Sequence, residues 1–235
     1  SGWKKPAGHG AKFVSKYIKT GMNCIDVGAN IGYYSTLYSK NVGKHGKVIS
    51  LEPSPINFKF LKSNLENQKM NNFICDNVAA GEKIDSVDFC LDLRANKCFI
   101  LTGNELMPPD YKIIKVPVKT IDQVVTDEKL KKIDFIKIDV EGYEWKTLEG
   151  GFKSIKLFKP TVQIEIHFPK IGLQTTLKIF NFFNDEKYDI IFYNESFYNI
   201  FKKYTNSKNE LNIQTFLDYL PKHDPKISFK FILEN

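Results

Sequence analysis

The sequence predicts an α/β fold with a doubly wound, mostly parallel sheet. Buried-strand patterns alternate with helical patterns along most of the chain, which is the order that builds a parallel sheet covered by helices on both faces. The stretch Asn23–Ser35 also predicts a strand, a tight glycine turn and the first turn of a helix. In open α/β sheets such a turn lies at the carboxyl ends of the strands, where nucleotide-like ligands bind.

The individual elements follow from periodicity and from breaker residues. An N-terminal helix is expected over residues 8–20, because apolar residues recur there at helical spacing and Gly21 follows. Ser54 and Pro55 predict the start of another helix, since serine is a favoured N-cap and proline a favoured first helical residue. The expected core strands are Asn23–Val27, Lys47–Leu51, Asn71–Ala79, Asp134–Val140, Thr161–His167, Tyr188–Tyr193 and Ile227–Leu233, and the other expected helices are Tyr33–Asn41, Ile121–Leu130, Glu141–Leu148 and Leu173–Asn184.

The strand period changes in two places. Ser86–Leu93 and Lys112–Lys119 alternate like antiparallel strands and predict an inserted β-hairpin, with an inserted loop over residues 93–115. The last two expected strands favour an antiparallel strand at the edge of the sheet. Residues 195–226 between them are aromatic and polar, and we interpret them as a variable C-terminal insertion.

The size of the chain, 235 residues of which 42% are hydrophobic, fits one α/β domain over residues 1–235. No apolar run approaches the roughly 18 residues of a membrane span, and the N-terminus shows no signal-peptide pattern. Ser1-Gly2 resembles a cleavage scar without an initiator Met, which is consistent with a domain excised from a longer multidomain protein. The four cysteines lack C-x-x-C spacing, which favours inert thiols and a reducing, cytoplasmic compartment.

The positive charge of the chain comes almost entirely from lysine. The net charge is +7, and Arg94 is the only arginine. A surface that recognises phosphates or bases normally uses arginine, because its planar fork pairs with two acceptors at once. The composition therefore favours lysines that are simply solvated at the surface. The alternative is that their charge serves to attract an anionic substrate, a glycan or a nucleic acid.

The glycine turn speaks against a dinucleotide. A G-x-G-x-x-G pattern that begins at Gly28 would require glycine at positions 30 and 33, which hold Asn30 and Tyr33. Those glycines let a pyrophosphate approach the backbone, so an NAD-dependent dehydrogenase is disfavoured. The turn from Gly28 to Gly32 suits an adenosine without phosphates.

Acidic residues follow three core strands of the expected sheet. Asp26, Glu52 and Asp139 stand at the carboxyl ends of these strands. Glu52 lies about 20 residues beyond the glycine turn, the place where an acid accepts both ribose hydroxyls of an adenosine. Asp26 either organises the turn or contacts the ligand. After the third strand, the amide of Asn77 or the backbone of Val78 is expected near an adenine edge.

Two motifs carry a resemblance to known methyltransferases. Ile25–Ser35 resembles the first motif of class I S-adenosylmethionine-dependent methyltransferases, and Phe135–Glu144, followed by Leu148–Gly151, resembles the signature of the FkbM family. Val118–Asp122 and Ile164–His167 add to a match that spans roughly Gly21–Pro169. The resemblance implies a class I, Rossmann-like fold, S-adenosylmethionine as cofactor, and methyl transfer to hydroxyls, often of sugars or glycosylated natural products. The expected cofactor-binding residues are Asp26, Gly28, Ala29, Asn30, Gly32, Tyr33, Glu52, Pro53, Asn77, Val78 and Asp139.

Methyl transfer to a hydroxyl requires that both partners are held at attack distance and that the hydroxyl proton is removed. Asp139, Glu141, Glu165 and His167 form the titratable cluster expected at the strand ends. His167 is the first candidate for the general base, because its unperturbed pKa lies near neutrality. Asp139 is instead expected to face the cofactor or the acceptor hydroxyl.

A divalent cation such as Mg²⁺ is an alternative means of activating the hydroxyl. Asp139, Glu141 and Glu165 offer hard oxygen ligands on neighbouring strand ends. A bound cation would lower the pKa of the hydroxyl without a protein base. Tyr33 and Tyr34 either pack against the sulfonium through cation–π attraction or serve in ordinary packing.

The expected function is therefore S-adenosylmethionine-dependent O-methylation of a hydroxyl on a sugar, glycan or glycosylated small molecule. The same-class alternative is an RNA or nucleotide methyltransferase, which the positive charge favours. A second alternative is a non-catalytic adenosine-binding module of a larger assembly. The expected partner is a small-molecule or glycan acceptor, with nucleic acid as the alternative.

Overall fold

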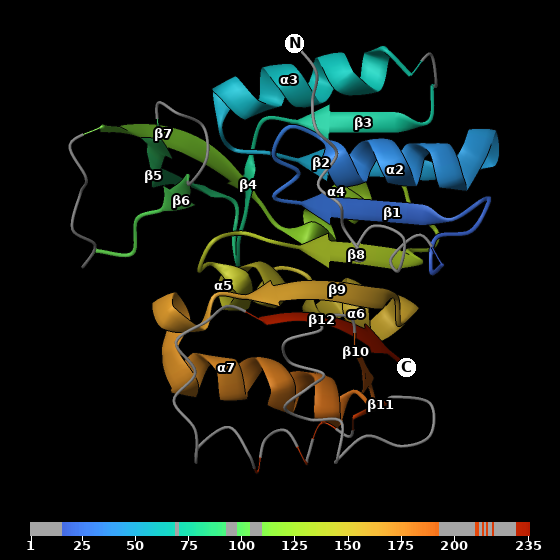
Figure 1. Cartoon of the computed structure of the whole chain (residues 1–235), viewed down its shortest axis with the longest axis vertical. Helices are drawn as coiled ribbons and strands as arrows, with labels where there is room; N and C mark the ends of the chain where they lie inside the picture. The colour runs from blue at the N-terminus through green and yellow to red at the C-terminus, as the bar shows by residue number, and fades with distance from the viewer. Residues whose placement is uncertain are drawn as a thin grey trace.

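Two β-sheets form the framework of the protein in this computed structural model (Figure 1). The structure describes residues 16–68, 71–92, 98–103, 110–192, 210–211, 213, 215, 218 and 229–235. Among these residues, no helix combines the length and the apolar character needed to cross a bilayer.

The large sheet has eight strands in the order β11-β10-β12-β9-β8-β1-β2-β3. Its members are β1 (Asn23–Val27), β2 (Lys47–Leu51), β3 (Phe73–Asp76), β8 (Phe135–Ile138), β9 (Thr161–Ile166), β10 (Asp189–Phe192), β11 (Glu210–Leu211) and β12 (Phe229–Glu234). Five neighbouring strands, β9, β8, β1, β2 and β3 in that order, pair in parallel. The expected doubly wound, mostly parallel sheet is therefore confirmed.

The expected antiparallel edge is present among the described strands, but β12 itself lies inside the sheet. It pairs antiparallel with β9 on one side and β10 on the other, and only the short β11 occupies the antiparallel edge. Phe231 and Ile232 are both fully buried and belong to different core clusters on the two faces. A strand that is apolar on both faces belongs in a sheet interior rather than at its edge.

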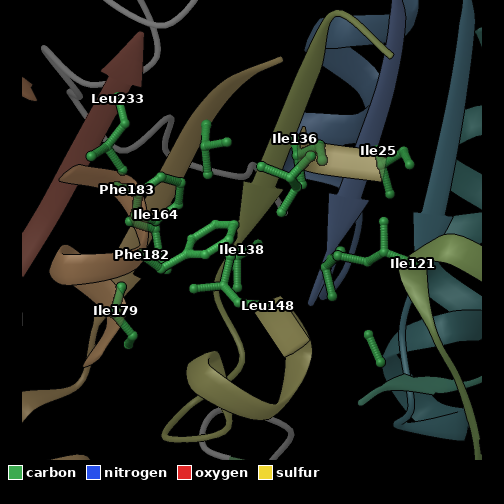
Figure 2. Close-up of a cluster of buried hydrophobic side chains, with 14 of the residues drawn as sticks. Ile25, Ile121, Ile136, Ile138, Leu148, Ile164, Ile179, Phe182, Phe183 and Leu233 are labelled. Carbon is green, nitrogen blue, oxygen red and sulfur yellow. The ribbon is translucent and has the colours of Figure 1, made fainter. Parts of the chain in front are cut away.

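Helices cover both faces of the large sheet. α2 (Tyr33–Val42) and α3 (Pro55–Glu66) pack on one face, and α4 (Ile121–Asp127), α5 (Glu144–Glu149), α6 (Phe152–Phe158) and α7 (Phe168–Asp185) on the other, with a 3₁₀ turn at Gly43–His45. Successive strand residues alternate between these faces. Cys24 therefore packs in a cluster with Tyr38 and Val42 of α2. Ile25 belongs to the larger core with Ile136, Ile164 and Phe183 (Figure 2).

The smaller sheet has the order β4-β7-β5-β6 and lies beyond the carboxyl ends of β1, β3 and β8 (Figure 1). It consists of β4 (Ala79–Ala80), β5 (Asp85–Asp92), β6 (Phe99–Ile100) and β7 (Tyr111–Lys119). The antiparallel pairing of β5 with β7 confirms the predicted hairpin. The single strand expected over Asn71–Ala79 is wrong, because the chain leaves the large sheet after Asp76 and enters the small sheet at Ala79.

Some helix boundaries also differ from the expectation. Residues 16–20 form turns and irregular backbone, and the rest of the expected helix over 8–20 lies outside the described residues. The helix after β8 begins at Glu144 instead of Glu141, because Glu141 and Gly142 have positive φ angles of 54° and 107°. α7 begins at Phe168 and bends at Gly172. Of the expected loop 93–115, residues 93–97 and 104–109 lie outside the described residues, as does most of the 195–226 insertion.

A buried polar network lies between the large sheet and α2. Lys137 Nζ lies 3.2 Å from Asp26 Oδ1 and 3.6 Å from Asp139 Oδ2, and it donates to the Gly28 carbonyl at 3.2 Å. Asp26 Oδ2 accepts from Ser35 Oγ at 2.6 Å. Burial opposes the charge of Lys137, but the carboxylates of Asp26 and Asp139 outweigh it and raise the pKa of the ammonium. The network thereby joins β8, β1 and the first turn of α2.

Replacing Lys137 by methionine should destabilise the protein by about 3–5 kcal/mol, because Asp26 would stay buried without its cation. Urea unfolding followed by circular dichroism measures this loss. Lys119→Met is the comparison, since Lys119 pairs with Asp76 at a partly exposed site and should cost less than about 1 kcal/mol. The double variant Asp26→Asn/Lys137→Met should recover part of the loss. A Lys137→Met protein as stable as Lys119→Met would contradict this account of the network.

Candidate functional site

A cleft lies between the carboxyl ends of the large sheet and the small sheet. Seven of the residues predicted from sequence line it, namely Gly28, Asn30, Glu52, Pro53, Val78, Asp139 and Glu141. The other lining residues are Val27, Leu51, Asn57, Ala79, Ala80, Phe89, Cys98, Ile100 and Val140. The large sheet therefore contributes most of the polar groups, while the small sheet contributes an apolar wall that suits the flat face of a base.

The glycine turn is packed directly against the end of β8. Gly28 has a φ of 73°, and a Cβ placed on it would lie 1.9 Å from the Asp139 carbonyl oxygen. Gly32 precedes α2 with a φ of 87°, and a Cβ there would lie 2.7 Å from Leu61 Cδ1. Both positions thus require glycine for space as well as for conformation. The turn is fixed against β8 on one side and α3 on the other.

Glu52, the acid expected to bind the ribose, directly follows β2 and lines the cleft. Its Oε2 accepts from the backbone N–H of Asn30 at 2.7 Å, and its Oε1 from that of Ser54 at 2.9 Å. Each oxygen keeps a further lone pair, so the carboxylate can still accept two donors from a cis-diol. Burial raises the pKa of Glu52 to about 7, although the two backbone donors oppose this shift. The residue is 5% exposed and lines the cleft.

Asn57, in the first turn of α3, is a cleft residue that the sequence analysis missed. It is 2% exposed, and its side-chain Oδ1 has no hydrogen-bond partner among the residues that the structure describes. An unpaired buried amide is costly unless a ligand completes it. The only sequence signal was its place just after the Ser54 N-cap, where helix N-termini face the strand ends. The unpaired Oδ1 could accept a hydrogen bond from a donor on a bound adenosine.

Several predicted cofactor residues serve the turn rather than line the cleft. Asp26 is directed at Lys137 and Ser35. The Asn77 amide donates to the carbonyls of Glu52 and Pro53, at 2.7 and 3.0 Å, so it holds the backbone of the acid instead of facing the ligand. Ala29 and Gly32 belong to the turn without lining the cleft. Tyr33 is 38% exposed and packs edge-on against Tyr34.

The four predicted catalytic residues meet at one edge of the cleft. His167 Nε2 lies 3.5 Å from Glu141 Oε1 and 4.0 Å from Glu165 Oε1, and the Asp139 carboxylate joins the same group. Lys170, on α7, binds Glu141 through both its carboxylate, at 2.7 Å, and its carbonyl, at 3.0 Å. The four residues predicted as a titratable cluster therefore do lie together, and Lys170 holds one of them.

His167 was the first candidate for the general base because the unperturbed pKa of histidine is near neutral. Its environment in the structure raises that pKa. His167 Nδ1 lies 2.6 Å from Oε1 of the fully buried Glu144. Burial would lower the pKa of the imidazole, but hydrogen bonds with Glu141 and Glu144 outweigh it and raise the pKa to about 10. A histidine that is already protonated accepts no proton at neutral pH. The sequence offers Glu144 only as a residue near Glu141 or at the surface, because its burial against His167 depends on how α5 packs.

Glu165 has a different environment. It pairs with Lys230 on β12, and burial together with the nearby Asp139 raises the pKa of its carboxyl, against the opposing effect of Lys230. Glu165 is thus a carboxylate with increased basicity beside the cleft edge, a property expected of a proton acceptor.

The sheet order, the glycine turn and the ribose-type acid define a class I S-adenosylmethionine-dependent methyltransferase fold. A family model, the methyltransferase FkbM domain, matches residues 26–190. The chain therefore belongs to the FkbM methyltransferase family, whose methyl donor is S-adenosylmethionine. The free acceptor sites of Glu52 and the orphaned Asn57 amide are consistent with that donor.

Individual relatives agree with this fold. The chain resembles the FkbM methyltransferase of Methylobacillus flagellatus KT with a TM-score of 0.52 and 22% identity, over 73% of this chain and 40% of that one. It resembles an rRNA methylase of Streptococcus thermophilus with a TM-score of 0.52 and 10% identity, over 100% and 99% of the two chains. In sequence it is 26% identical over 155 residues to the ribosomal RNA large subunit methyltransferase E of Buchnera aphidicola, which covers 62% of this chain and 70% of that protein. The chain spans two fifths of the FkbM structure that it matches, and identities this low establish the fold alone.

Asn57→Ala should weaken binding of S-adenosylhomocysteine by about tenfold or more, because a ligand group would lose its buried partner. Isothermal titration calorimetry measures this affinity. Asn67→Ala is the matched control, since Asn67 is exposed at the far end of the same helix. Equal affinities of the two variants would show that the Asn57 amide does not contact the donor.

Binding of S-adenosylhomocysteine should strengthen as the pH rises from about 6 to 8. The ribose hydroxyls donate to the ionised form of Glu52, and its pKa of about 7 places the loss of the proton within this range. Glu52→Gln should bind more weakly at pH 8 and remove most of the pH dependence. An affinity for wild type that stays constant over this range would contradict the assignment of Glu52.

Proposed function

We propose that this protein transfers the methyl group of S-adenosylmethionine to a hydroxyl oxygen of a sugar, a glycan or a glycosylated small molecule. The observation that carries the proposal is a group of three carboxylates after β8 and on β9. Asp139 and Glu141 line the cleft, and Glu165 lies beside them, 4.0 Å from His167 Nε2. Carboxylates accept hydrogen bonds from the many hydroxyls of a sugar, whereas they repel the phosphates of a polyanion.

The donor supplies an electrophilic methyl group on a positively charged sulfur. In the proposed reaction the acceptor oxygen forms a bond to the methyl carbon while the carbon–sulfur bond breaks, and the sulfur keeps the electron pair. Asp139 lines the cleft beside the glycine turn and is placed to orient the acceptor hydroxyl. Glu165 receives the hydroxyl proton, because its environment favours the protonated form.

Methylation of RNA is the second candidate, and two observations favour it. A relative of 26% identity is a ribosomal RNA methyltransferase, and the chain carries a net charge of +7. Against it stand the carboxylates at the cleft edge and the single arginine of the chain.

We propose a cytoplasmic location as part of the main function, because the four cysteines form no disulfide in the described part of the chain.

A transfer assay with radiolabelled S-adenosylmethionine should show methylation of sugar-containing acceptors and none of ribosomal RNA. Glu165→Gln should lower turnover by about 100-fold or more, since general base catalysis contributes that much. Asp139→Asn should lower it by about 100-fold, because the acceptor hydroxyl would lose its orienting group. Binding of S-adenosylhomocysteine should change only a few-fold. Asp88→Asn, at an exposed pair with Lys115 on the small sheet, is the control with unchanged turnover. Methylation of RNA but of no sugar would overturn the proposal.

A further inference from the structure

His167 is held in the manner of a metal-binding histidine. It is 7% exposed, its Nδ1 lies 2.6 Å from the buried Glu144, and its Nε2 is directed toward the oxygens of Glu141 and Glu165. Metal-bound histidines commonly have a carboxylate on the other ring nitrogen, which fixes the ring orientation and increases its basicity. The Glu144–His167 pair reproduces that arrangement, and Nε2 faces Glu141 Oε1 at 3.5 Å.

The spacing of the neighbouring oxygens fits a single ion. One ligand atom each from Asp139, Glu141 and His167 lie within 4.8 Å of one another. Two ligands of the same ion, each about 2.0–2.5 Å from it, are separated by at most about 4–5 Å. The spacing is therefore compatible with one ion shared by all three side chains after small side-chain adjustments.

The charges around these three side chains do not balance. The ion pairs and hydrogen bonds that extend from them connect five carboxylates to three ammonium groups. The carboxylates are Asp26, Asp139, Glu141, Glu144 and Glu165, and the ammonium groups are those of Lys137, Lys170 and Lys230. The imidazolium of His167 reduces this excess to one negative charge, but an ion bound at Nε2 would displace the ring proton and restore an excess of two, which equals the charge of one divalent cation.

Glu144 also fixes the loop that carries Glu141. Its Oε1 accepts from the Gly142 backbone N–H at 2.9 Å in addition to facing His167. Lys170 holds the other carboxylate oxygen of Glu141, which leaves Oε1 on the side of His167. The buried carboxylate of Glu144 thus helps to position two of the three ligand side chains, those of Glu141 and His167.

We propose that Asp139, Glu141 and His167 bind one divalent first-row transition ion, such as Mn²⁺ or Zn²⁺, with Glu144 as the positioning residue. The imidazole ligand favours such an ion over the Mg²⁺ expected from carboxylates alone. Three protein ligands leave coordination positions open for an acceptor oxygen, whose pKa the ion would lower. The role of the ion in catalysis rests on the proposed function, whereas the site itself does not.

The test is a Mn²⁺ titration of tag-free, metal-stripped protein, followed by electron paramagnetic resonance without donor or acceptor. Wild type should bind one Mn²⁺ per chain, and Zn²⁺ should displace it at far lower concentration than Mg²⁺. Asp139→Asn and His167→Gln should each weaken Mn²⁺ binding by at least about tenfold, and Glu144→Gln by about 10–100-fold. Glu128→Gln should leave it unchanged, because Glu128 pairs with Lys47 at the opposite end of the sheet.

Two outcomes would overturn the site. One is wild type without stoichiometric Mn²⁺ binding, and the other is His167→Gln that binds Mn²⁺ as tightly as wild type. Circular dichroism confirms that each variant is folded, and Glu141→Gln replaces His167→Gln if the latter does not fold. Calorimetry with S-adenosylhomocysteine on the same proteins separates the two proposals. If the protein binds S-adenosylhomocysteine but no metal ion, the proposed function stands and the metal site is rejected. If wild type does not bind S-adenosylhomocysteine, the proposed function is rejected.

Discussion

The buried ammonium of Lys137 is the interaction on which the site depends. It is 3% exposed, and it joins the Asp26 carboxylate under the glycine turn, the Gly28 carbonyl within the turn and the Asp139 carboxylate at the end of the neighbouring strand. A cation buried this deeply persists only where opposite charges surround it. The same contacts that compensate its burial therefore fix the donor turn relative to the acceptor edge. Catalysis by positioning requires that fixed relation, because small displacements of the reacting groups are costly.

This arrangement divides the cleft into two functional sides. On the donor side, Glu52 and Asn57 present acceptor and amide groups from β2 and α3, and the small sheet provides the apolar wall. On the acceptor side, carboxylates and one imidazole gather at the ends of β8 and β9. The first side requires only an adenosine-like ligand, which the whole class shares. The second side contains the groups that distinguish hydroxyl activation from simple donor binding.

Local patterns in the sequence were enough to predict the parallel core, the glycine turn and Glu52, because each depends on neighbouring residues. The strands could be recognised from their apolar runs, and the Ser54 cap from its own motif. Contacts between distant elements could not be predicted in this way. The buried Glu144 on α5 helps to raise the pKa of His167 at the start of α7, and nothing in the sequence near His167 indicates it. The lysine within the apolar Phe135–Ile138 strand was the one visible sign of the buried network.

A crystal structure with bound S-adenosylhomocysteine tests the central claim most directly. The account predicts that both ribose hydroxyls donate to Glu52, that a polar atom of the nucleoside completes the Asn57 amide, and that the sulfur lies between the glycine turn and Asp139. The acceptor carboxylates should then border the position from which the methyl group leaves. A nucleoside bound away from Glu52, or a sulfur directed away from Asp139, would contradict the account.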